Sequence, residues 1–212
     1  MPSIVSAIPN LYSEETHKNI IDFIDNEVFD YTPTRAKDHC NRHIWNDLDF
    51  FKEEHHRLSS LVSKVFEEPV VPTYTCLSLY DETIGILPPH IDRPRCRYTL
   101  SYMIRCSDIP FWPIYVAKKE LSDQEYSVAF DDTPKIVTNG LAVTSEEEEY
   151  IKNSTEWAKI DHSPNSAAFF SGTHRWHYRD EIPKGSAQIV LFHYLPLHPD
   201  RPRPETDKPP LV

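Results

Sequence analysis

His90-Ile91-Asp92 is the segment of this sequence whose residue types and spacing are best suited to metal chemistry. Alternate residues of a β-strand point to the same face, so an imidazole and a carboxylate would stand side by side here. Two histidines and one carboxylate form the facial triad that holds iron(II) and leaves coordination positions open. The doublet supplies two of these ligands. Taken alone, it is equally consistent with an ordinary hydrogen-bonded histidine–carboxylate pair at a loop.

A third ligand would have to come from a later part of the chain. His174 and His177 both follow the β-rich run 167–170. Within one strand, residues at this spacing face opposite sides, so only one of the two could join His90 and Asp92. The spacing does not choose between them. A histidine at this place in a strand-rich sequence favours a metal site over a simple polar pair.

The elements that would position these residues are helices in the first third of the chain and short strands after it. Ser13 can cap a helix with apolar residues at helical spacing, and a second helical pattern ends before Pro69. From residue 70 onward, runs rich in β-branched and aromatic residues predict strands at 73–80, 98–104, 111–116, 167–170 and 188–195. This order predicts a mainly β protein: a largely antiparallel barrel or double sheet, buttressed by the N-terminal helices.

The predicted organisation is a single domain over residues 1–195, with helical support in 1–69 and the barrel core in 70–195. Residues 196–212 are proline-rich and are expected to form a C-terminal tail. Asn139-Gly140 between two short β-rich runs predicts a hairpin. It lies in the segment 117–166, which is longer than a barrel needs and is expected to form a lid or a substrate-facing loop.

Together these features resemble the 2-oxoglutarate- and iron(II)-dependent oxygenase superfamily, and within it the prolyl-hydroxylase-like branch most closely. The resemblance covers residues 70–195 and rests on His90-Ile91-Asp92 and on His177-Tyr178-Arg179-Asp180-Glu181, which precedes Gly185 and a last strand. It implies a double-stranded β-helix, a jelly-roll or cupin-like barrel, and makes His177 the third metal ligand with His174 in reserve. It also implies Fe(II) and 2-oxoglutarate as cofactors, and hydroxylation of a C–H bond of an amino acid, peptide or other small molecule.

One position departs from the family pattern. The resemblance calls for a basic residue shortly after the hairpin glycine, to pair with the distal carboxylate of 2-oxoglutarate, but this chain has Ala187 there. A carboxylate in a closed barrel needs a charged hydrogen-bonding partner, so the charge must come from another residue. The candidates for the co-substrate pocket are Arg179 or Arg97 for the charge and Tyr80 and Tyr102 as hydroxyl donors, with His193 as a possible inward-facing neighbour.

Composition and motifs exclude several other functions. With four glycines in 212 residues, the chain has no G-x-G-x-x-G and no Walker phosphate loop. It also lacks a G-x-S-x-G nucleophile elbow and an H-E-x-x-H helix. Phosphate backbones are bound by Lys and Arg, so a net charge of −11 makes nucleic acid a poor partner. We expect a small-molecule or peptidyl substrate.

The sequence also bears on location. Its start lacks the charged and apolar regions of a signal peptide, and no apolar run approaches the roughly 20 residues of a membrane span. The four cysteines contain no C-x-x-C pair. These features predict a cytoplasmic protein with reduced thiols and no membrane association. They do not indicate an oligomeric state.

Two other functions fit the same residues. Two histidines and a carboxylate also hold zinc in hydrolases. A non-catalytic, cupin-like binding or scaffold protein would keep the barrel without the reaction, and Ala187 favours this alternative. Metal content and 2-oxoglutarate binding distinguish both alternatives from an oxygenase.

Overall fold

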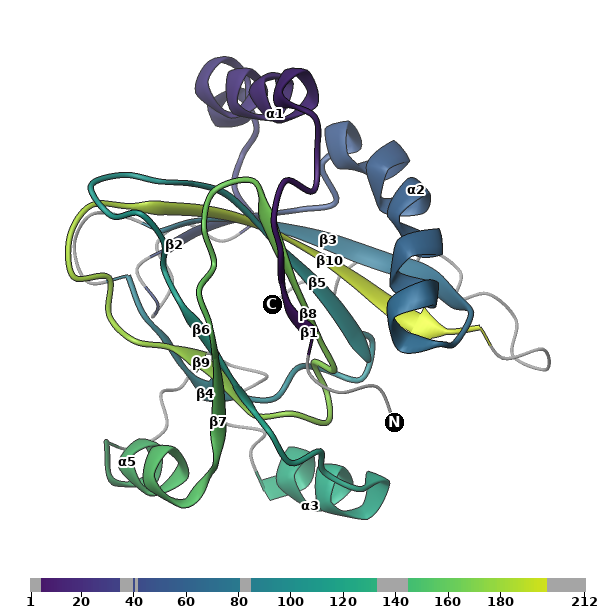
Figure 1. The fold of residues 1–212 in the computed structure, drawn as a ribbon, viewed down its shortest axis with the longest axis vertical. Helices are drawn as coiled ribbons and strands as arrows, with labels where there is room; N and C mark the ends of the chain where they lie inside the picture. The colour runs from purple at the N-terminus through teal and green to yellow at the C-terminus, as the bar shows by residue number, and fades with distance from the viewer. Residues whose placement is uncertain (1–4, 35–39, 41, 81–84, 133–144, 198–212) are drawn as a thin grey trace.

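The structure, a computed structural model, describes residues 5–34, 40, 42–80, 85–132 and 145–197 (Figure 1). Two antiparallel sheets dominate it, one six-stranded in the order β1-β8-β5-β10-β3-β2 and one four-stranded in the order β4-β9-β6-β7. The strands are β1 (Val5–Ile8), β2 (Arg42–Asn46), β3 (Val70–Tyr80), β4 (Leu87–His90), β5 (Tyr98–Cys106), β6 (Ile114–Ala117), β7 (Trp157–Ile160), β8 (Ser166–Phe170), β9 (His177–Arg179) and β10 (Ala187–Pro196). The helices are α1 (Glu14–Asn26), the short 3-10 helix η1 (Val28–Asp30), α2 (Asp49–Phe66), α3 (Asp123–Asp132) and α5 (Ser145–Ser154). The predicted fold class, mainly β with two antiparallel sheets in a jelly-roll arrangement, is confirmed.

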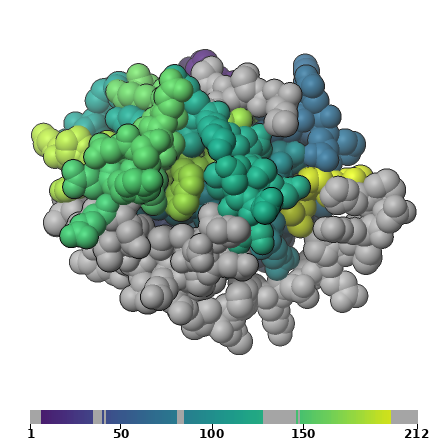
Figure 2. Space-filling view, turned by 90° about the horizontal axis from the view of Figure 1, so that it is seen from below, coloured from purple at the N-terminus to yellow at the C-terminus, as the bar shows by residue number. Residues whose placement is uncertain are grey.

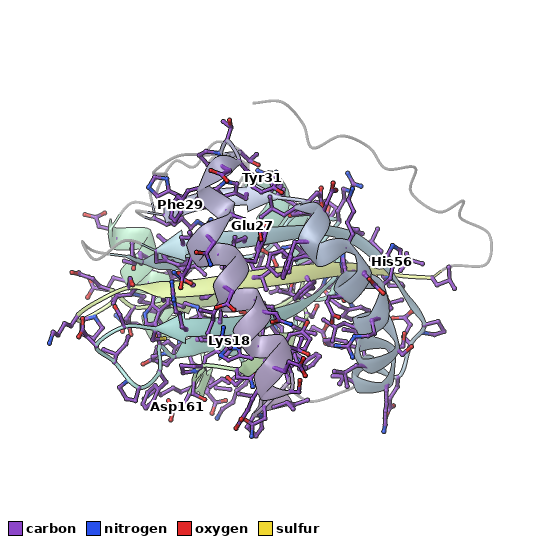
Figure 3. All side chains as sticks on the ribbon, turned by 90° about the horizontal axis from the view of Figure 1, so that it is seen from above. Lys18, Glu27, Phe29, Tyr31, His56 and Asp161 are labelled. Carbon is purple, nitrogen blue, oxygen red and sulfur yellow. The ribbon has the colours of Figure 1, made fainter. Side chains whose placement is uncertain are left out.

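Helices α1 and α2 cover the outer face of the six-stranded sheet (Figure 1). As predicted, Ser13 caps α1, because its Oγ accepts a hydrogen bond of 3.2 Å from the Thr16 N–H. The apolar stripe of α1, which includes Phe23 and Ile24, is buried against the sheet. The opposite side of α1 is polar, and Lys18 lies on it with 70% of its side chain exposed (Figure 3). Because α1 packs its apolar side against one face of the six-stranded sheet, the other face of that sheet lines the barrel interior.

Side chains of the six-stranded sheet alternate between the helix layer and the barrel interior. On β5, Leu100 and Tyr102 pack in the core shared with α1 and α2, whereas Met103 packs with the interior group that contains Tyr80 and Trp112. A second interior group joins strands of both sheets, for example Val116 of β6 with strand β8. The inward-facing positions of β3, β5 and β10 therefore line the space between the sheets.

The structure also differs from the sequence-based expectations. Residues before 70 contribute not only helices but also β1 and β2, which complete the two edges of the six-stranded sheet. The strand expected at 111–116 begins only at Ile114. The segment 117–166 contains α3, α5 and β7, and the two helices lie on the side of the four-stranded sheet (Figures 1 and 2). The hairpin expected at Asn139-Gly140 and residues 198–212 of the tail lie outside the described residues. Within the described part of the chain, no helix has the length and apolarity needed to cross a membrane.

Candidate metal centre

Strands β4 and β9 bring two histidines side by side. They pair antiparallel with His90 opposite His177, and the two ring centroids are 4.1 Å apart. Because β4 lies at the edge of its sheet, Pro88 and Pro89 in this strand can be accommodated despite lacking N–H donors. His177 is also opposite Val116 of β6, so its strand is held from both sides. The register of the small sheet thus places two imidazoles in contact across the strands.

Asp92 completes the group from just beyond the end of β4. Its backbone N–H donates a hydrogen bond of 2.8 Å to the carbonyl of Gly172, which fixes the loop after the strand. Its Oδ1 lies 3.8 Å from His90 Nε2 and 3.7 Å from His177 Nε2. One donor atom from each of the three residues lies within 4.8 Å of the others. The structure therefore brings His90, Asp92 and His177 together, although Asp92 is not itself in a strand.

Both imidazoles have their Nε2 lone pairs directed at this shared space. His90 Nδ1 donates to the Pro88 carbonyl at 2.8 Å, and His177 Nδ1 donates to the Arg175 carbonyl at 2.9 Å. A carbonyl can only accept, so each Nδ1 carries the proton and each Nε2 is free to ligate. Burial lowers the pKa of His177 to about 4; burial, and then the neighbouring His177, lower the pKa of His90 to about 3. Both rings are neutral near pH 7, as metal ligation requires.

Gly172 is required by the close packing behind Asp92. A Cβ at this position would lie 2.2 Å from Asp92 Oδ2, 2.5 Å from the Cys96 carbonyl and 2.7 Å from Thr99 Oγ1. All three distances are shorter than real Cβ contacts, so any side chain at residue 172 would displace Asp92. Gly172, which lies between β8 and His177, is therefore needed to keep Asp92 in this position.

His174 does not join the group. Its Nε2 is 2.8 Å from Asp123 Oδ1, its Nδ1 is 2.6 Å from Thr173 Oγ1, and its ring stacks on Tyr126 at 4.8 Å. Both ring nitrogens are therefore engaged on the side of helix α3. Of the two histidines that the spacing left open, His177 is the one placed beside His90 and Asp92.

A second polar group lies behind Asp92, and the sequence did not reveal most of it. Thr99 Oγ1 donates to Asp92 Oδ2 at 3.1 Å and lies 3.1 Å from His193 Nδ1. Cys96 is buried nearby, and its Sγ is 3.0 Å from the Tyr74 hydroxyl. Donor atoms of Asp92, Cys96 and His193 also lie within 4.8 Å of one another. The alternation of side chains along β5 could have indicated Thr99, because this residue occupies an inward-facing position of the strand.

Arg179 lies in the barrel interior, two residues after His177 on the same strand and so on the same face. It is 1% exposed, and its guanidinium donates to the Trp112 carbonyl at 2.5 Å, to His162 Nδ1 at 2.8 Å and to Ser101 Oγ at 3.5 Å. The side chain also lies over the Trp112 ring, at 4.9 Å. All of these partners are neutral.

The charge of Arg179 is therefore not compensated within the described residues, where no carboxylate pairs with it. The three hydrogen bonds use three of the five N–H groups of a guanidinium. Burial lowers the pKa of Arg179 to about 10, although it remains charged at neutral pH. A buried cation with neutral partners and donors to spare is suited to an anionic ligand.

Tyr80 and Ala187 share this part of the interior. The Tyr80 ring meets the Trp112 ring edge to face at 4.7 Å, and Ala187 stands opposite Tyr80 on the neighbouring strand. The Tyr80 hydroxyl accepts a hydrogen bond of 3.0 Å from Arg42. Ala187 is fully buried in the same cluster. The small methyl group thus lies where the family pattern has a cation, and Arg179 brings a cation to this cluster from the opposite sheet.

The other two candidates for the co-substrate pocket lie elsewhere. Tyr102 faces the helix layer, where its hydroxyl is 2.5 Å from His17 Nδ1 and its ring packs on Tyr12. Arg97 is 3.5 Å from the carboxylate of Glu120 and is partly exposed. The alternation of β5 places Tyr102 on the wrong face, and Arg97 already has an anionic partner. Neither residue is brought to the interior beside Arg179.

Comparison with solved structures identifies the architecture. The non-haem alpha-ketoglutarate-dependent epimerase SnoN from nogalamycin biosynthesis is 9% identical, with a TM-score of 0.66 over 90% of this chain and 77% of that chain. HygX from Streptomyces hygroscopicus, solved with nickel and 2-oxoglutarate, is 10% identical, with a TM-score of 0.60 over 90% of this chain and 82% of that chain. The alpha-ketoglutarate-dependent carbocyclase SnoK is 8% identical, with a TM-score of 0.62 over 89% of this chain and 78% of that chain. The chain has the fold of these enzymes.

At this level of identity the likeness establishes the fold and not the reaction. No protein-family model matches the sequence, and no curated protein is similar to it at the sequence level. The narrower resemblance to prolyl hydroxylases therefore stays a prediction. Chemically, two neutral imidazoles and a carboxylate fit a divalent metal such as iron(II) or zinc.

Proposed function

We propose that this protein is an iron(II)- and 2-oxoglutarate-dependent oxygenase that oxidises a C–H bond of a small-molecule substrate. The observation that carries the proposal is the pairing of two features on one strand. His177 of β9 joins His90 and Asp92 in a group of metal donors, and Arg179 of the same strand is a buried cation with neutral partners. A metal chelator that carries a second carboxylate would satisfy both features at once.

The residues would act mainly by holding and orienting. His90, Asp92 and His177 would hold the metal on one side, leaving the opposite side for ligands. Arg179 would bind the distal carboxylate of 2-oxoglutarate, and Tyr80 and Trp112 would shape and dry the surrounding space. When bound, iron(II) and 2-oxoglutarate supply an oxidation coupled to the release of succinate and carbon dioxide. An interior that excludes water would favour this reaction, because it would keep water from the reacting groups.

The similar structures broaden the range of products to test. SnoN is named an epimerase and SnoK a carbocyclase, and HygX has been solved with hygromycin B. Hydroxylation, epimerisation and ring closure share the removal of hydrogen from a C–H bond. We therefore propose C–H oxidation of a small molecule as the common step, with an amino acid or peptide as the narrower expectation from the sequence.

The proposal is tested by anaerobic purification, metal analysis and an assay of succinate formation. We expect bound iron(II), binding of 2-oxoglutarate, and succinate formation that increases when a suitable candidate substrate is added from a panel of amino acids, peptides and glycosides. Mass spectrometry of the product would then show an added oxygen atom, an unchanged mass or the loss of two hydrogens. His90→Ala, Asp92→Ala and His177→Ala should abolish succinate formation, and His174→Ala should retain it. Loss in His174→Ala with retention in His177→Ala would contradict the assigned ligand set.

The zinc hydrolase and the non-catalytic scaffold predict different results. A zinc hydrolase would hold zinc and would not bind 2-oxoglutarate. A scaffold protein would bind neither iron nor 2-oxoglutarate. Purified protein that holds zinc and shows no affinity for 2-oxoglutarate with either metal would reject the oxygenase proposal.

A further inference from the structure

The two oxygens of Asp92 have different surroundings. Oδ1 is directed at the two histidines, at 3.8 and 3.7 Å from their Nε2 atoms. Oδ2 points the other way and accepts a hydrogen bond of 3.1 Å from the Thr99 hydroxyl. A Cβ at Gly172 would fall 2.2 Å from Oδ2, so glycine is needed here to leave room for this oxygen. The hydrogen bond from Thr99 then holds Oδ2 on the side away from the histidines.

The Thr99 hydroxyl in turn connects Asp92 to His193. A hydroxyl has a single proton, and Thr99 gives it to Asp92 Oδ2. The second contact of Thr99 Oγ1, at 3.1 Å from His193 Nδ1, must therefore be one in which His193 donates. His193 stands directly opposite Thr99 on β10, and both residues are buried, at 3% and 1% exposure. The result is a series of two hydrogen bonds, in which His193 donates to Thr99 and Thr99 donates to the Asp92 carboxylate.

His193 is itself firmly placed. Its backbone carbonyl accepts hydrogen bonds of 2.9 Å from both His55 Nε2 and Thr73 Oγ1, and its ring lies 4.7 Å from that of Tyr74. The contact with Thr99 places an N–H on His193 Nδ1. Strand pairing and packing therefore hold His193, the first donor, in place, just as Asp92, the final acceptor, is held.

We propose that Thr99 and His193 are positioning residues that restrict Asp92 to ligation through Oδ1 alone. This inference rests on the proposed oxygenase function, because it concerns the geometry of that metal site. Three protein donors leave three positions of an octahedral metal open, two for 2-oxoglutarate and one for oxygen. A carboxylate that ligated through both oxygens would fill one of these positions. Holding Oδ2 away from the metal keeps the site open to its co-substrates.

The test compares paired variants by isothermal titration calorimetry. Mn²⁺ serves as the metal probe, and 2-oxoglutarate is then titrated into Mn²⁺-saturated protein, so that binding is measured without turnover. We expect Thr99→Val to weaken the affinity for 2-oxoglutarate by about 10-fold or more, in line with the effects of losing outer partners of metal ligands. Thr99→Ser keeps the hydroxyl and should stay within about 3-fold of the unmodified protein.

Two further comparisons separate positioning from general packing. Thr75→Val is the matched control, since Thr75 is a buried threonine of β3 whose side chain makes no described hydrogen bond to Asp92, Thr99 or His193. It should leave 2-oxoglutarate affinity unchanged. His193→Asn presents an amide donor near the place of Nδ1 and should bind 2-oxoglutarate more tightly than His193→Leu. This second pair provides the same test should Thr99→Val fail to fold.

The outcomes are distinct for the two proposals. If the unmodified protein binds no Mn²⁺, or if His177→Ala binds it equally well, the oxygenase proposal fails and this inference fails with it. If the unmodified protein binds Mn²⁺ and 2-oxoglutarate but Thr99→Val and His193→Leu bind 2-oxoglutarate just as tightly, only the positioning role is rejected. A second equivalent of Mn²⁺ that is lost in Cys96→Ser would also reject it, because Asp92 Oδ2 would then be a ligand in a site with Cys96 and His193.

Discussion

Replacing Arg179 with methionine should remove 2-oxoglutarate binding while leaving the fold and the metal donors in place. Methionine keeps an unbranched apolar stem and lacks the charged guanidinium group. Losing one partner of a buried, hydrogen-bonded charge pair weakens binding by about 2–5 kcal/mol, which corresponds to roughly 30-fold to several thousand-fold in Kd. Arg179 contacts neither His90 nor Asp92 among its described hydrogen bonds, so Mn²⁺ affinity should change little.

Thermal unfolding offers a direct measurement of this loss. At a 2-oxoglutarate concentration of 100 times Kd, ligand binding stabilises the Mn²⁺-loaded protein by about 2.7 kcal/mol. For a chain of this length, each kcal/mol corresponds to about 2–4 °C in Tm, so the shift should be about 5–11 °C. At the same concentration, Arg179→Met should show a shift of at most about 3 °C, even at the weak end of the expected range.

The stability of the ligand-free variant is informative too. Burial lowers the pKa of Arg179 from its ordinary value to about 10, so the folded protein disfavours the charged side chain by about 3 kcal/mol at neutral pH. Methionine relieves this penalty, but it also removes three hydrogen bonds to buried acceptors, which together are of similar magnitude. We therefore expect the ligand-free Tm to remain within a few degrees of that of the unmodified protein.

Arg97→Met is the matched control, because Arg97 is partly exposed and already paired with Glu120. It should retain the full shift with 2-oxoglutarate. A full shift in Arg179→Met, or an equal loss in both variants, would refute the assignment of Arg179 as the anchor of the distal carboxylate.

Three other outcomes follow from the structure. Gly172→Ala should lose Mn²⁺ binding in calorimetry, because its Cβ would fall 2.2 Å from Asp92 Oδ2; unchanged affinity would show that Asp92 is not held as described. In the double variant Arg179→Met/Ala187→Lys, a cation supplied from β10 should recover part of the 2-oxoglutarate-dependent Tm shift; no recovery would show that residue 187 does not reach the same site. Acid should unfold the ligand-free protein well above pH 4, as followed by circular dichroism. Burial strongly lowers the pKa of five histidines, so below about pH 6.5 the unfolded chain binds more protons than the folded chain and stability falls as pH falls, by about 1.4 kcal/mol per histidine per pH unit. These histidines are His55, His90, His162, His177 and His193. A protein that stayed folded at pH 4 would contradict the neutral, buried state of these rings.

Local patterns were sufficient to predict the main elements of this fold. The cap at Ser13 and the alternating strands β3, β5 and β10 follow from short-range chemistry that is visible in the sequence. Strand β2 was not predicted, because it is a short edge strand within a segment dominated by helical signals, and its pairing with β3 is set by the sheet and not by its own residues.

The sequence predicted those parts of the site that depend on the spacing of residues along the chain. It did not predict the parts that depend on how two strands pair. His90 and Asp92 are close in sequence, so their proximity was evident. The choice of His177 over His174 depended on a family resemblance, because only the pairing of β9 with β4 decides which histidine faces His90. Tyr102 was expected in the co-substrate pocket, but strand alternation turns it toward α1. A shift of one residue along a strand turns a side chain to the opposite face of the sheet. Aromatic residues pack on both faces of this sheet, so the residue type of Tyr102 did not indicate its face.

If Arg179 anchors the co-substrate as proposed, strand β9 alone sets the distance between this anchor and the metal donor His177. The two residues are separated by a single strand repeat, which spans about 6.6–6.8 Å along the backbone. In the proposed site, the distance between the metal and the carboxylate anchor would depend on this one three-residue strand, whereas an anchor at position 187 would depend on the register between strands of different sheets. Dicarboxylic keto acids one carbon shorter or longer than 2-oxoglutarate should be rejected, even by variants with an altered substrate pocket.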